Sequence, residues 1–364
     1  MSGYHIEQDK INNHKTDSIL DGLYHDERKG YSFTDWINSM RDEEMASNTV
    51  YAYACELHRF ASYLASIEHL ESIYDVDVEV LDRQKAIDIQ RYMTYLRENG
   101  VAESGRARSL SALRTVYQYY VDHGIISQNS PRLVNIPKIH IKQKNRLEKE
   151  ELEELLRGVA TADVLPDRQK KIILNSTNSR DIAIIKTLSG TGIRVSELVG
   201  LDLTDINFKH GKLLVTRKGG DQEYVDMGEK VNDAIKEYVL SERTKNYYST
   251  GKSEEEMIKE MVRDAQKDNK LAVFLSSRGE KGRLTVRSVE RLVSKYSKAT
   301  NIANVVSPHG LRRTYGSTLI EVASLDEVSK ALGHKNIQVT KDHYVVRTKS
   351  NSDKLKTFSD DLLS

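Results

Sequence analysis

The sequence predicts a mainly α-helical fold with a small β-sheet (α+β), divided between two domains. Its 364 residues exceed what a single domain core usually accommodates. Apolar residues recur at helical spacing over long stretches of the chain. One pair of β-prone runs flanks Gly219-Gly220, which predicts a hairpin rather than a large sheet.

Three apolar stripes at helical spacing predict a helical bundle over residues 31–135. The stripes consist of Val50, Ala54, Leu57, Phe60, Ala61 and Leu64, then Ala86, Ile89, Met93 and Leu96, then Leu110, Leu113, Val116, Tyr117 and Tyr120. Gly100 and Gly124 follow the second and third stripes and are expected to end those helices. Residues 1–30 show no strong periodicity, so we expect an N-terminal extension whose order the pattern does not define.

A basic segment, residues 136–146, is expected to link the two domains. Pro131 and Pro137 disfavour a helix or a central strand here. Residues 136–147 contain no acidic residue, and the first one after them is Glu148, whereas the segment carries Lys138, Lys142, Lys144 and Arg146. Such a segment suits either a solvated tether or a linker that follows a phosphate backbone.

The second domain, residues 147–348, is expected to be mostly helical. Residues 212–217 and 222–227 are the two β-prone runs of the predicted hairpin. Residues 241–270 are highly charged and predict a helical insertion on the surface. A short tail, residues 349–364, follows this domain.

The composition favours a soluble protein of a reducing compartment. Hydrophobic residues make up 38% and charged residues 30% of the chain. No stretch approaches the roughly 20 apolar residues that span a bilayer, and the N-terminus lacks the apolar run of a secretory signal. The single Cys55 excludes an internal disulfide and a cysteine-built metal cage. The net charge of +1 leaves any DNA binding to the local distribution of basic residues.

Ser307-Pro308 predicts the start of a helix that carries two cationic groups. His309 and Arg312 are three residues apart, so both lie on one face of its first turns. The N-terminus of a helix also directs backbone N–H groups at a nearby anion. The pattern suits a phosphate, although alone it is more typical of a solvated surface helix.

A histidine and a tyrosine follow at fixed places. Ser324 and Glu327 fit a capping box that opens a short helix, and Gly333 ends this helix directly before His334. Tyr344 lies ten residues later, where a tyrosine is usually a packing residue. Because a phenol with a pKa near 10 is a poor nucleophile, catalysis by this tyrosine would need cationic groups nearby.

Arg194 and Glu197 are three residues apart, so the carboxylate can hold the guanidinium in one orientation. The glycines before Arg194 do not form a nucleotide-binding loop, because neither Gly-Lys-Ser/Thr nor Gly-x-Gly-x-x-Gly is present. Lys218 lies at the tip of the predicted hairpin. By itself it is typical of a solvated turn residue.

Together, and in this order, these motifs resemble the tyrosine recombinase family, which includes the Xer-type recombinases and the phage and transposon integrases. The most specific phrases are Thr-Gly-Ile-Arg-Val-Ser-Glu-Leu at 191–198 and Leu-Gly-His-Lys-Asn at 332–336. The resemblance covers residues 147–344 and extends more loosely to the helical bundle. It implies an N-terminal helical core-binding domain followed by a mixed catalytic domain.

The resemblance implies site-specific DNA recombination by six catalytic residues, Arg194, Lys218, His309, Arg312, His334 and Tyr344. The tyrosine would attack the phosphate and form a 3′-phosphotyrosyl link, while the arginines would bind the non-bridging oxygens. The lysine would protonate the leaving 5′ oxygen, and the histidines would bind the phosphate or assist proton transfer. No metal or cofactor would be needed, because side chains supply the cations.

The implied partners are double-stranded DNA sites and further copies of the chain, in a tetrameric synapse that passes through a Holliday junction. An accessory protein stays open, and we expect a cytoplasmic, nucleoid-associated location without membrane contact. DNA contacts are expected from Arg106, Arg108, Arg114, Lys142, Lys144 and Arg146. The tail either docks on a neighbouring protomer or is a frayed end. Relatives often have His two residues after the tyrosine, where this chain has Val346.

Several functions are compatible with this residue set. Within recombination, both chromosome-dimer resolution and the integration or excision of a mobile element are open. A type IB topoisomerase uses similar chemistry on one duplex, but the spacing from His334 to Tyr344 favours a recombinase. A DNA-binding regulator without catalysis would form no covalent DNA adduct.

Overall fold

The computed structural model divides by internal packing into a unit of residues 3–142 and a second unit made chiefly of residues 143–364. It describes residues 3–21, 33–137, 146–217, 219–243, 252–267, 271–276, 282–300, 302–303, 305–334, 336–337 and 340. Within these ranges, no helix is both long enough and apolar enough to cross a membrane.

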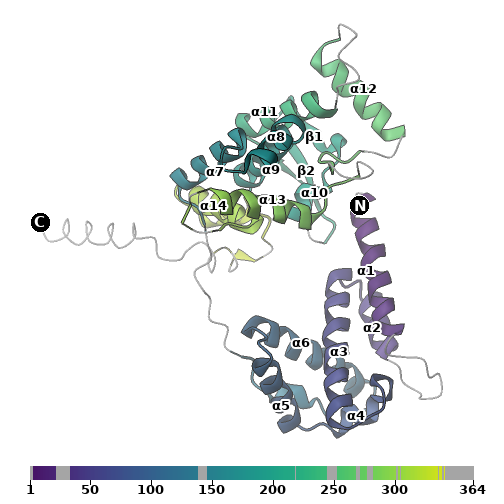
Figure 1. Ribbon diagram of the computed structural model, residues 1–364. Helices are drawn as coiled ribbons and strands as arrows, with labels where there is room; N and C mark the ends of the chain where they lie inside the picture. The colour runs from purple at the N-terminus through teal and green to yellow at the C-terminus, as the bar shows by residue number, and fades with distance from the viewer. Residues whose placement is uncertain are drawn as a thin grey trace, which may run out of the picture. The chain divides into compact units, whose positions relative to one another are not determined.

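The N-terminal unit is helical (Figure 1). Its elements are α1 (Gly3–Asp21), α2 (Phe33–Asp42), α3 (Ser47–Ile67), η1 (Ile73–Asp75), α4 (Val78–Arg83), α5 (Ala86–Glu98), α6 (Glu103–Asp122) and η2 (Ser130–Leu133). The helix α3 packs against α1, α2 and α6, and α5 packs against α6. The three predicted stripes lie on α3, α5 and α6, and all their members except the half-buried Ala86 are buried in one core. Burial of these apolar faces stabilises the bundle.

The helix α1 lies within residues 1–30, for which the sequence pattern left the order undefined. It packs against α3, and Ile19 lies against the apolar core, while other contacts of the helix are polar. Asn12 Nδ2 donates to Ser47 Oγ (3.1 Å) and to Asn48 Oδ1 (2.9 Å), and Asp17 pairs with Arg41 at 2.6 Å. Because this interface carries no apolar stripe, hydrophobic periodicity could not reveal the helix.

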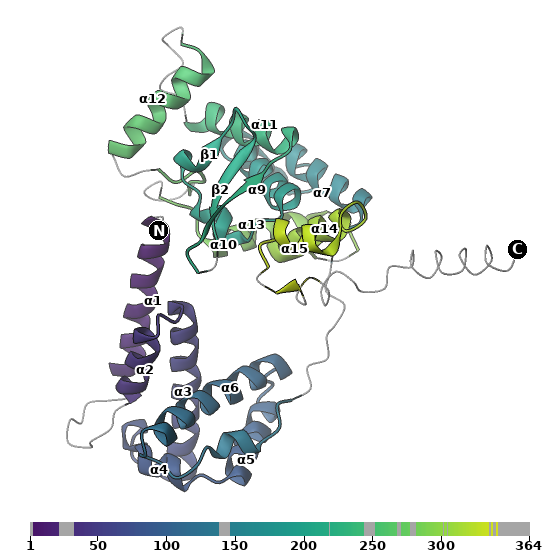
Figure 2. The ribbon, with the colours of Figure 1, turned by 180° about the vertical axis from the view of Figure 1, so that it is seen from behind.

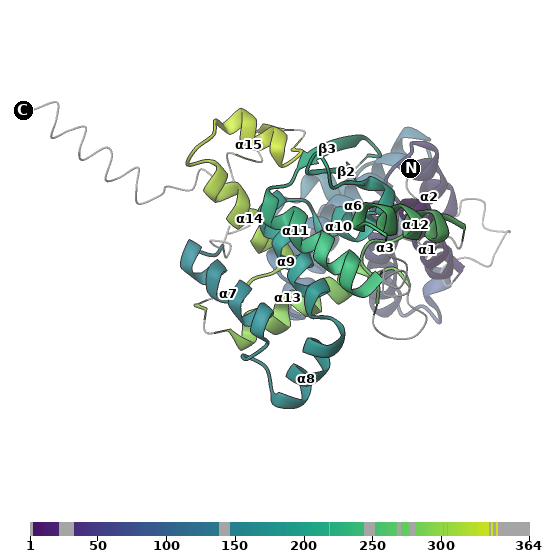
Figure 3. The same ribbon diagram turned by 90° about the horizontal axis from the view of Figure 1, so that it is seen from above.

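The C-terminal unit is built around the buried helix α9 (Asn178–Thr191), which contacts α7 (Lys149–Thr161), α11 (Glu229–Tyr238), α13 (Val286–Ala299) and α14 (Pro308–Leu319) (Figure 3). Ala183, Ile184, Ile185 and Leu188 of α9 are buried. The remaining helical elements are α8 (Asp167–Ser176), α10 (Val195–Gly200), η3 (Leu203–Asp205), the π-helical turn η4 (Val239–Arg243), α12 (Glu254–Lys267) and α15 (Leu325–Ala331). The helix α12 lies in the charged insertion and buries Met257 and Met261.

The strands within the described residues form one antiparallel sheet in the order β1-β2-β3. Figure 2 shows the paired strands β1 and β2. The hairpin pairs β2 (Lys212–Thr216) with β3 (Gln222–Asp226), with Leu213 opposite Val225 and Thr216 opposite Gln222. The sequence predicts this hairpin but not β1 (Ile206–Asn207), which is too short for a detectable alternation. The prediction of a mainly helical fold with a small β-sheet is confirmed.

Candidate active site

Arg194 lies at the junction of α9 and α10, where the chain turns sharply. Gly192 ends α9 with a φ of +65°, and a β-carbon there would collide with the ring of Tyr315. Arg194 then precedes α10 as its N-cap residue. Its backbone N donates to Glu197 Oε2 and its Nη1 donates to Glu197 Oε1, each at 2.7 Å. The predicted pairing of Arg194 with Glu197 is therefore present, and the Glu197 carboxylate is buried.

Helix α14 carries His309 and Arg312 close to its start. Ser307 Oγ accepts a hydrogen bond of 3.1 Å from Gly310 N, which is the predicted N-cap. His309 is exposed in the first turn. Arg312, one turn later, is only 1% exposed. Its Nη1 donates to Gly192 O at 2.6 Å and its Nη2 donates to Leu332 O, so it joins α14 to two separate turns.

His334 follows the turn that ends α15. Ser324 Oγ caps the helix through Glu327 N, and Glu327 completes the capping box, as predicted. Gly333 leaves the helix with a φ of +58°, and His334 N donates to Ser329 O at 3.0 Å. The ring nitrogen His334 Nδ1 lies 2.8 Å from Thr340 Oγ1. This hydrogen bond orients the imidazole.

The end of α15 is held by a row of guanidinium groups. Three successive backbone carbonyls accept hydrogen bonds from arginine, namely Ala331 O from Arg217 (3.4 Å), Leu332 O from Arg312, and Gly333 O from Arg194 (3.2 Å). Cations at the C-terminus of a helix satisfy its last carbonyls and interact favourably with its dipole. The row gathers side chains from the residue after β2, from α14 and from the α9–α10 junction around the turn before His334.

The structure thus brings together Arg194, Arg312 and the turn that carries His334, with His309 one helical turn before Arg312. The other two predicted catalytic residues, Lys218 and Tyr344, lie outside the described residues. Within the described part of the chain, no group of His, Cys, Asp or Glu side chains is arranged to hold a metal ion. The arrangement presents cationic hydrogen-bond donors of the kind that bind phosphate oxygens.

The predicted DNA-binding arginines of the N-terminal unit differ in what they contact. Arg108 Nε pairs with Glu56 Oε1 at 3.0 Å, and its side chain is 57% exposed. Arg114 instead donates to two backbone carbonyls, Pro131 O at 3.2 Å and Val134 O at 2.6 Å. Arg106 donates to Val101 O at 2.7 Å. Arg108 is therefore the most accessible of the three to a ligand.

The linker residues predicted to contact DNA are described only in part. Arg146 pairs with Glu148 at 3.3 Å, and its side chain is 39% exposed. Lys142 and Lys144 lie outside the described residues.

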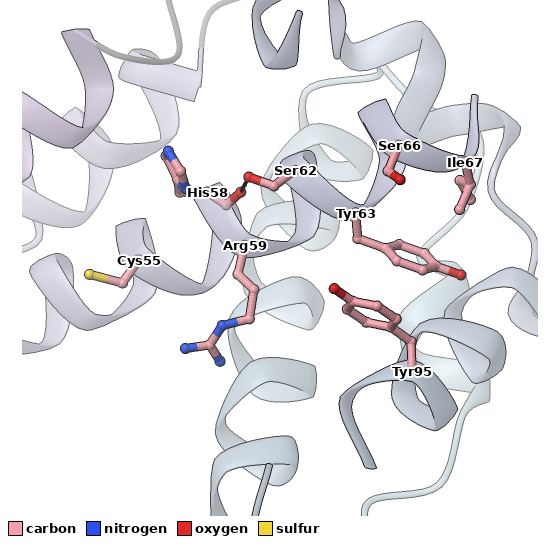
Figure 4. A pocket seen from close by; sticks show the side chains of 8 residues that line it. All are labelled: Cys55, His58, Arg59, Ser62, Tyr63, Ser66, Ile67 and Tyr95. Carbon is pink, nitrogen blue, oxygen red and sulfur yellow. Dashed lines mark hydrogen bonds between the residues drawn. The ribbon is translucent and has the colours of Figure 1, made fainter. Parts of the chain in front are cut away.

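Two pockets open on the N-terminal unit. The first has a volume of about 490 Å³ and is lined by Cys55, His58, Arg59, Ser62, Tyr63, Ser66, Ile67 and Tyr95. Figure 4 shows the rings of Tyr63, on α3, and Tyr95, on α5, next to each other, and their centroids are 4.9 Å apart. The second pocket, of about 610 Å³, is lined by Arg114, Thr115, Gln118 and Arg132. Both pockets combine basic and hydrogen-bonding side chains, which suits polar or anionic ligands.

Reasoning from the sequence missed Arg217. Its burial follows from the alternation of β2, in which Leu213 and Val215 point into the core. Continuing that alternation by two residues places Arg217 on the buried face. A buried arginine needs hydrogen-bond or ion-pair partners, so this alternation was the signal in the sequence that could have indicated a role for Arg217.

Two family models match the sequence. The model described as "Phage integrase family" matches residues 145–351, which is more than half of the chain. The model "Phage integrase, N-terminal SAM-like domain" matches residues 33–124. The chain belongs to the phage integrase family.

Individual relatives agree with this family membership. The tyrosine recombinase XerS of Streptococcus gordonii is 31% identical over 321 residues, which is 80% of this chain and 85% of the relative. The tyrosine recombinase XerC of Chlorobaculum tepidum is 28% identical over 301 residues, or 81% of this chain and 84% of the relative. The predicted resemblance to tyrosine recombinases is confirmed.

Solved structures of integrases share the fold of this phage integrase family member. The Tn1549 transposon integrase in complex with transposon right end DNA aligns with a TM-score of 0.60 and 18% identity, over 90% of this chain and 98% of that one. A lambda integrase dimer bound to a COC′ core site aligns with a TM-score of 0.58 and 16% identity, over 86% of this chain and 93% of that one.

Proposed function

We propose that this chain is a site-specific tyrosine recombinase, which cleaves and rejoins DNA strands. The observation that carries the proposal is that Arg194 and Arg312 donate hydrogen bonds to neighbouring carbonyls of the turn that precedes His334. Three separate segments of a phage integrase family member therefore supply cationic or imidazole groups to one place. A single DNA phosphate is the ligand that best fits such a set.

In the proposed cleavage step, the Tyr344 phenol oxygen bonds to phosphorus and the bond from phosphorus to the 5′ oxygen breaks. The phenol proton passes to His309 or His334, and Lys218 gives a proton to the departing 5′ oxygen. Arg194 and Arg312 stabilise the negative charge that builds on the non-bridging oxygens. The phosphotyrosyl bond conserves the energy of the broken phosphodiester, so rejoining the strands needs no ATP.

The burial of Arg312 constrains this step. Its guanidinium is almost fully buried, with both terminal nitrogens donating to backbone carbonyls. The cleavage-ready state therefore requires that the residues covering Arg312 move, while Arg194, whose side chain is 31% exposed, is already accessible. Such coupling of DNA binding to assembly of the site would keep the enzyme inactive away from its target.

We assign residues 31–135 as a core-binding domain, 136–146 as a basic linker and 147–348 as the catalytic domain, with residues 1–30 before them. Residues 349–364 lie outside the described residues, and for this tail both docking on a neighbouring protomer and a frayed end stay open. The proposed substrates are two double-stranded DNA sites, held by four protomers. Solved relatives include a lambda integrase tetramer bound to a Holliday junction, which supports this assembly. We propose a cytoplasmic, nucleoid-associated enzyme, with both chromosome-dimer resolution and mobile-element transfer as candidate roles.

A nicked suicide substrate tests the proposed chemistry, because loss of a short 5′ fragment traps the covalent protein–DNA adduct. We expect the wild type to form the adduct and Tyr344→Phe to bind the same DNA without forming it. The adduct should form equally in the presence of EDTA, since side chains supply the cations. Joining of paired sites, rather than relaxation of a supercoiled plasmid lacking them, would establish recombination. An adduct formed by Tyr344→Phe would contradict the proposal.

A further inference from the structure

Arg217 is a buried arginine directly after β2, with 6% of its surface exposed. Its backbone closes the turn of the hairpin, since Arg217 N donates to Asp221 O at 2.7 Å and Gly220 N donates to Arg217 O at 3.0 Å. Its side chain points away from this turn into the protein. One residue thus belongs both to the hairpin and to the packing around the candidate site.

The guanidinium of Arg217 shares a carboxylate with Arg194. Arg217 Nη1 lies 3.0 Å from Glu197 Oε2, the same oxygen that accepts the Arg194 backbone N–H, while Glu197 Oε1 accepts Arg194 Nη1. The second carboxylate on Arg217 is Glu223 Oε2, at 2.8 Å from Nε. Glu197 therefore lies between two cations, and the position of either guanidinium depends on the other.

Arg217 also contacts the turn before His334. Its Nη2 donates to Ala331 O at 3.4 Å. A β-carbon added to Gly333 would lie 2.7 Å from Arg217 Nε and 2.8 Å from Cζ, so the guanidinium packs directly against this glycine. The neighbouring carbonyl, Gly333 O, accepts from Arg194. Arg217 and Arg194 thus hold the same carboxylate and the same turn.

We propose that Arg217 is a positioning residue for DNA cleavage, which fixes the guanidinium of Arg194 against the turn that carries His334. The inference rests on the proposed recombinase function and deepens it. Arg217 itself is buried behind Glu197 and need not touch DNA. Without it, Glu197 and Arg194 would shift together, and a displacement of about 1 Å in a group that binds the reacting phosphate can slow a reaction about 100-fold.

The test compares single-turnover cleavage of two nicked suicide substrates. One substrate has an ordinary scissile phosphate, and the other has a methylphosphonate at that position. Of the two methylphosphonate diastereomers, the one that the wild type cleaves faster is used. The methylphosphonate carries one negative charge fewer, so a misplaced arginine should slow its cleavage less than that of the phosphodiester. We expect Arg217→Gln to cleave the phosphodiester about 100-fold more slowly than the wild type. On the methylphosphonate we expect a loss below about 10-fold.

A buried arginine elsewhere in the same unit provides the control. Arg180 is 7% exposed and donates to Asp181 Oδ1 at 2.8 Å and to Leu275 O at 2.9 Å, in a cluster that does not include Arg194. Arg180→Gln should slow the cleavage of both substrates by the same factor, because its effect would be structural. If Arg217→Gln does not fold, as judged by circular dichroism, Arg217→Lys takes its place, since a lysine keeps the charge but cannot reach all three partners.

Equal losses on both substrates for a folded Arg217 variant, or no loss on either, would overturn the inference. Failure of the proposed function has a different signature, namely that the wild type itself forms no adduct with either substrate. If Arg217→Gln and Arg194→Lys both lose less cleavage rate on the methylphosphonate than on the phosphodiester, the two residues act as one functional unit.

Discussion

Arg194 Nη2 donates a hydrogen bond of 3.2 Å to the backbone carbonyl of Gly333, across 139 residues of sequence. The bond joins the α9–α10 junction to the turn that presents His334. Arg312 makes the adjoining contact to Leu332 O from α14. The proposed phosphate clamp and the proposed histidine are therefore parts of one hydrogen-bonded assembly, and a change in either is expected to affect both.

Replacing the clamp arginines by lysine should impair cleavage severely. A lysine supplies one charge but not two parallel donors, so we expect Arg194→Lys and Arg312→Lys to cleave about 100- to 1,000-fold more slowly. The two variants should differ in stability. Arg312 is buried with two carbonyl partners, so Arg312→Lys should lose about 2 kcal/mol of unfolding free energy. Arg194 is more exposed, so Arg194→Lys should lose less unfolding free energy. Suicide-substrate kinetics and urea unfolding measure the two effects; near-normal cleavage by either variant would contradict the clamp.

Gly333→Ala should damage the site more than its left-handed backbone alone explains. The φ of +58° costs an alanine about 1 kcal/mol, and the new β-carbon would also press on Arg217. We expect a loss of about 3 kcal/mol in unfolding free energy together with slow cleavage. Gly100 has a φ of +76° with nothing within 4 Å of an added β-carbon, so Gly100→Ala should cost about 1 kcal/mol and cleave normally. Equal cleavage by the two variants would argue against a close-packed turn.

Substitutions of Arg108 and Arg114 should have different effects, the first on DNA binding and the second on stability. Arg108 is mostly exposed beside Glu56, so Arg108→Ala should weaken DNA binding and reduce the slope of log affinity against log salt by about 1. Arg114 holds two carbonyls of the 131–134 segment, so Arg114→Ala should lower the melting temperature through a loss of about 2 kcal/mol. Binding titrations at several salt concentrations and thermal melts measure both. A salt slope unchanged by Arg108→Ala would remove Arg108 from the DNA interface.

The sequence predicts those contacts that are accompanied by a regular or local spacing of residue types. The apolar faces of α3, α5 and α6, the caps at Ser307 and Ser324 and the pair Arg194–Glu197 follow from local spacing. The polar face of α1 does not, because its partners lie on α3, and their identities follow no period.

The row of arginines around α15 is beyond sequence reasoning for a related cause. Backbone carbonyls such as Gly192 O and Leu332 O exist at every residue, so no residue type marks them as acceptors. Only the fold decides which carbonyl meets Arg312. The inward position of Arg217 could have been read from the alternation of β2, but its partner Glu197 could not.

Identification of the tyrosine that becomes linked to DNA tests the central claim most directly. The wild type is trapped on a suicide substrate, digested, and the peptide that carries the nucleotide remnant is sequenced by mass spectrometry. Tyr315, the nearest alternative in sequence, packs beside Leu332, and burial raises the pKa of its phenol, which makes it a weaker nucleophile. We expect the remnant on Tyr344. Its attachment to Tyr315, or to any other residue, would contradict the proposed assembly of the site.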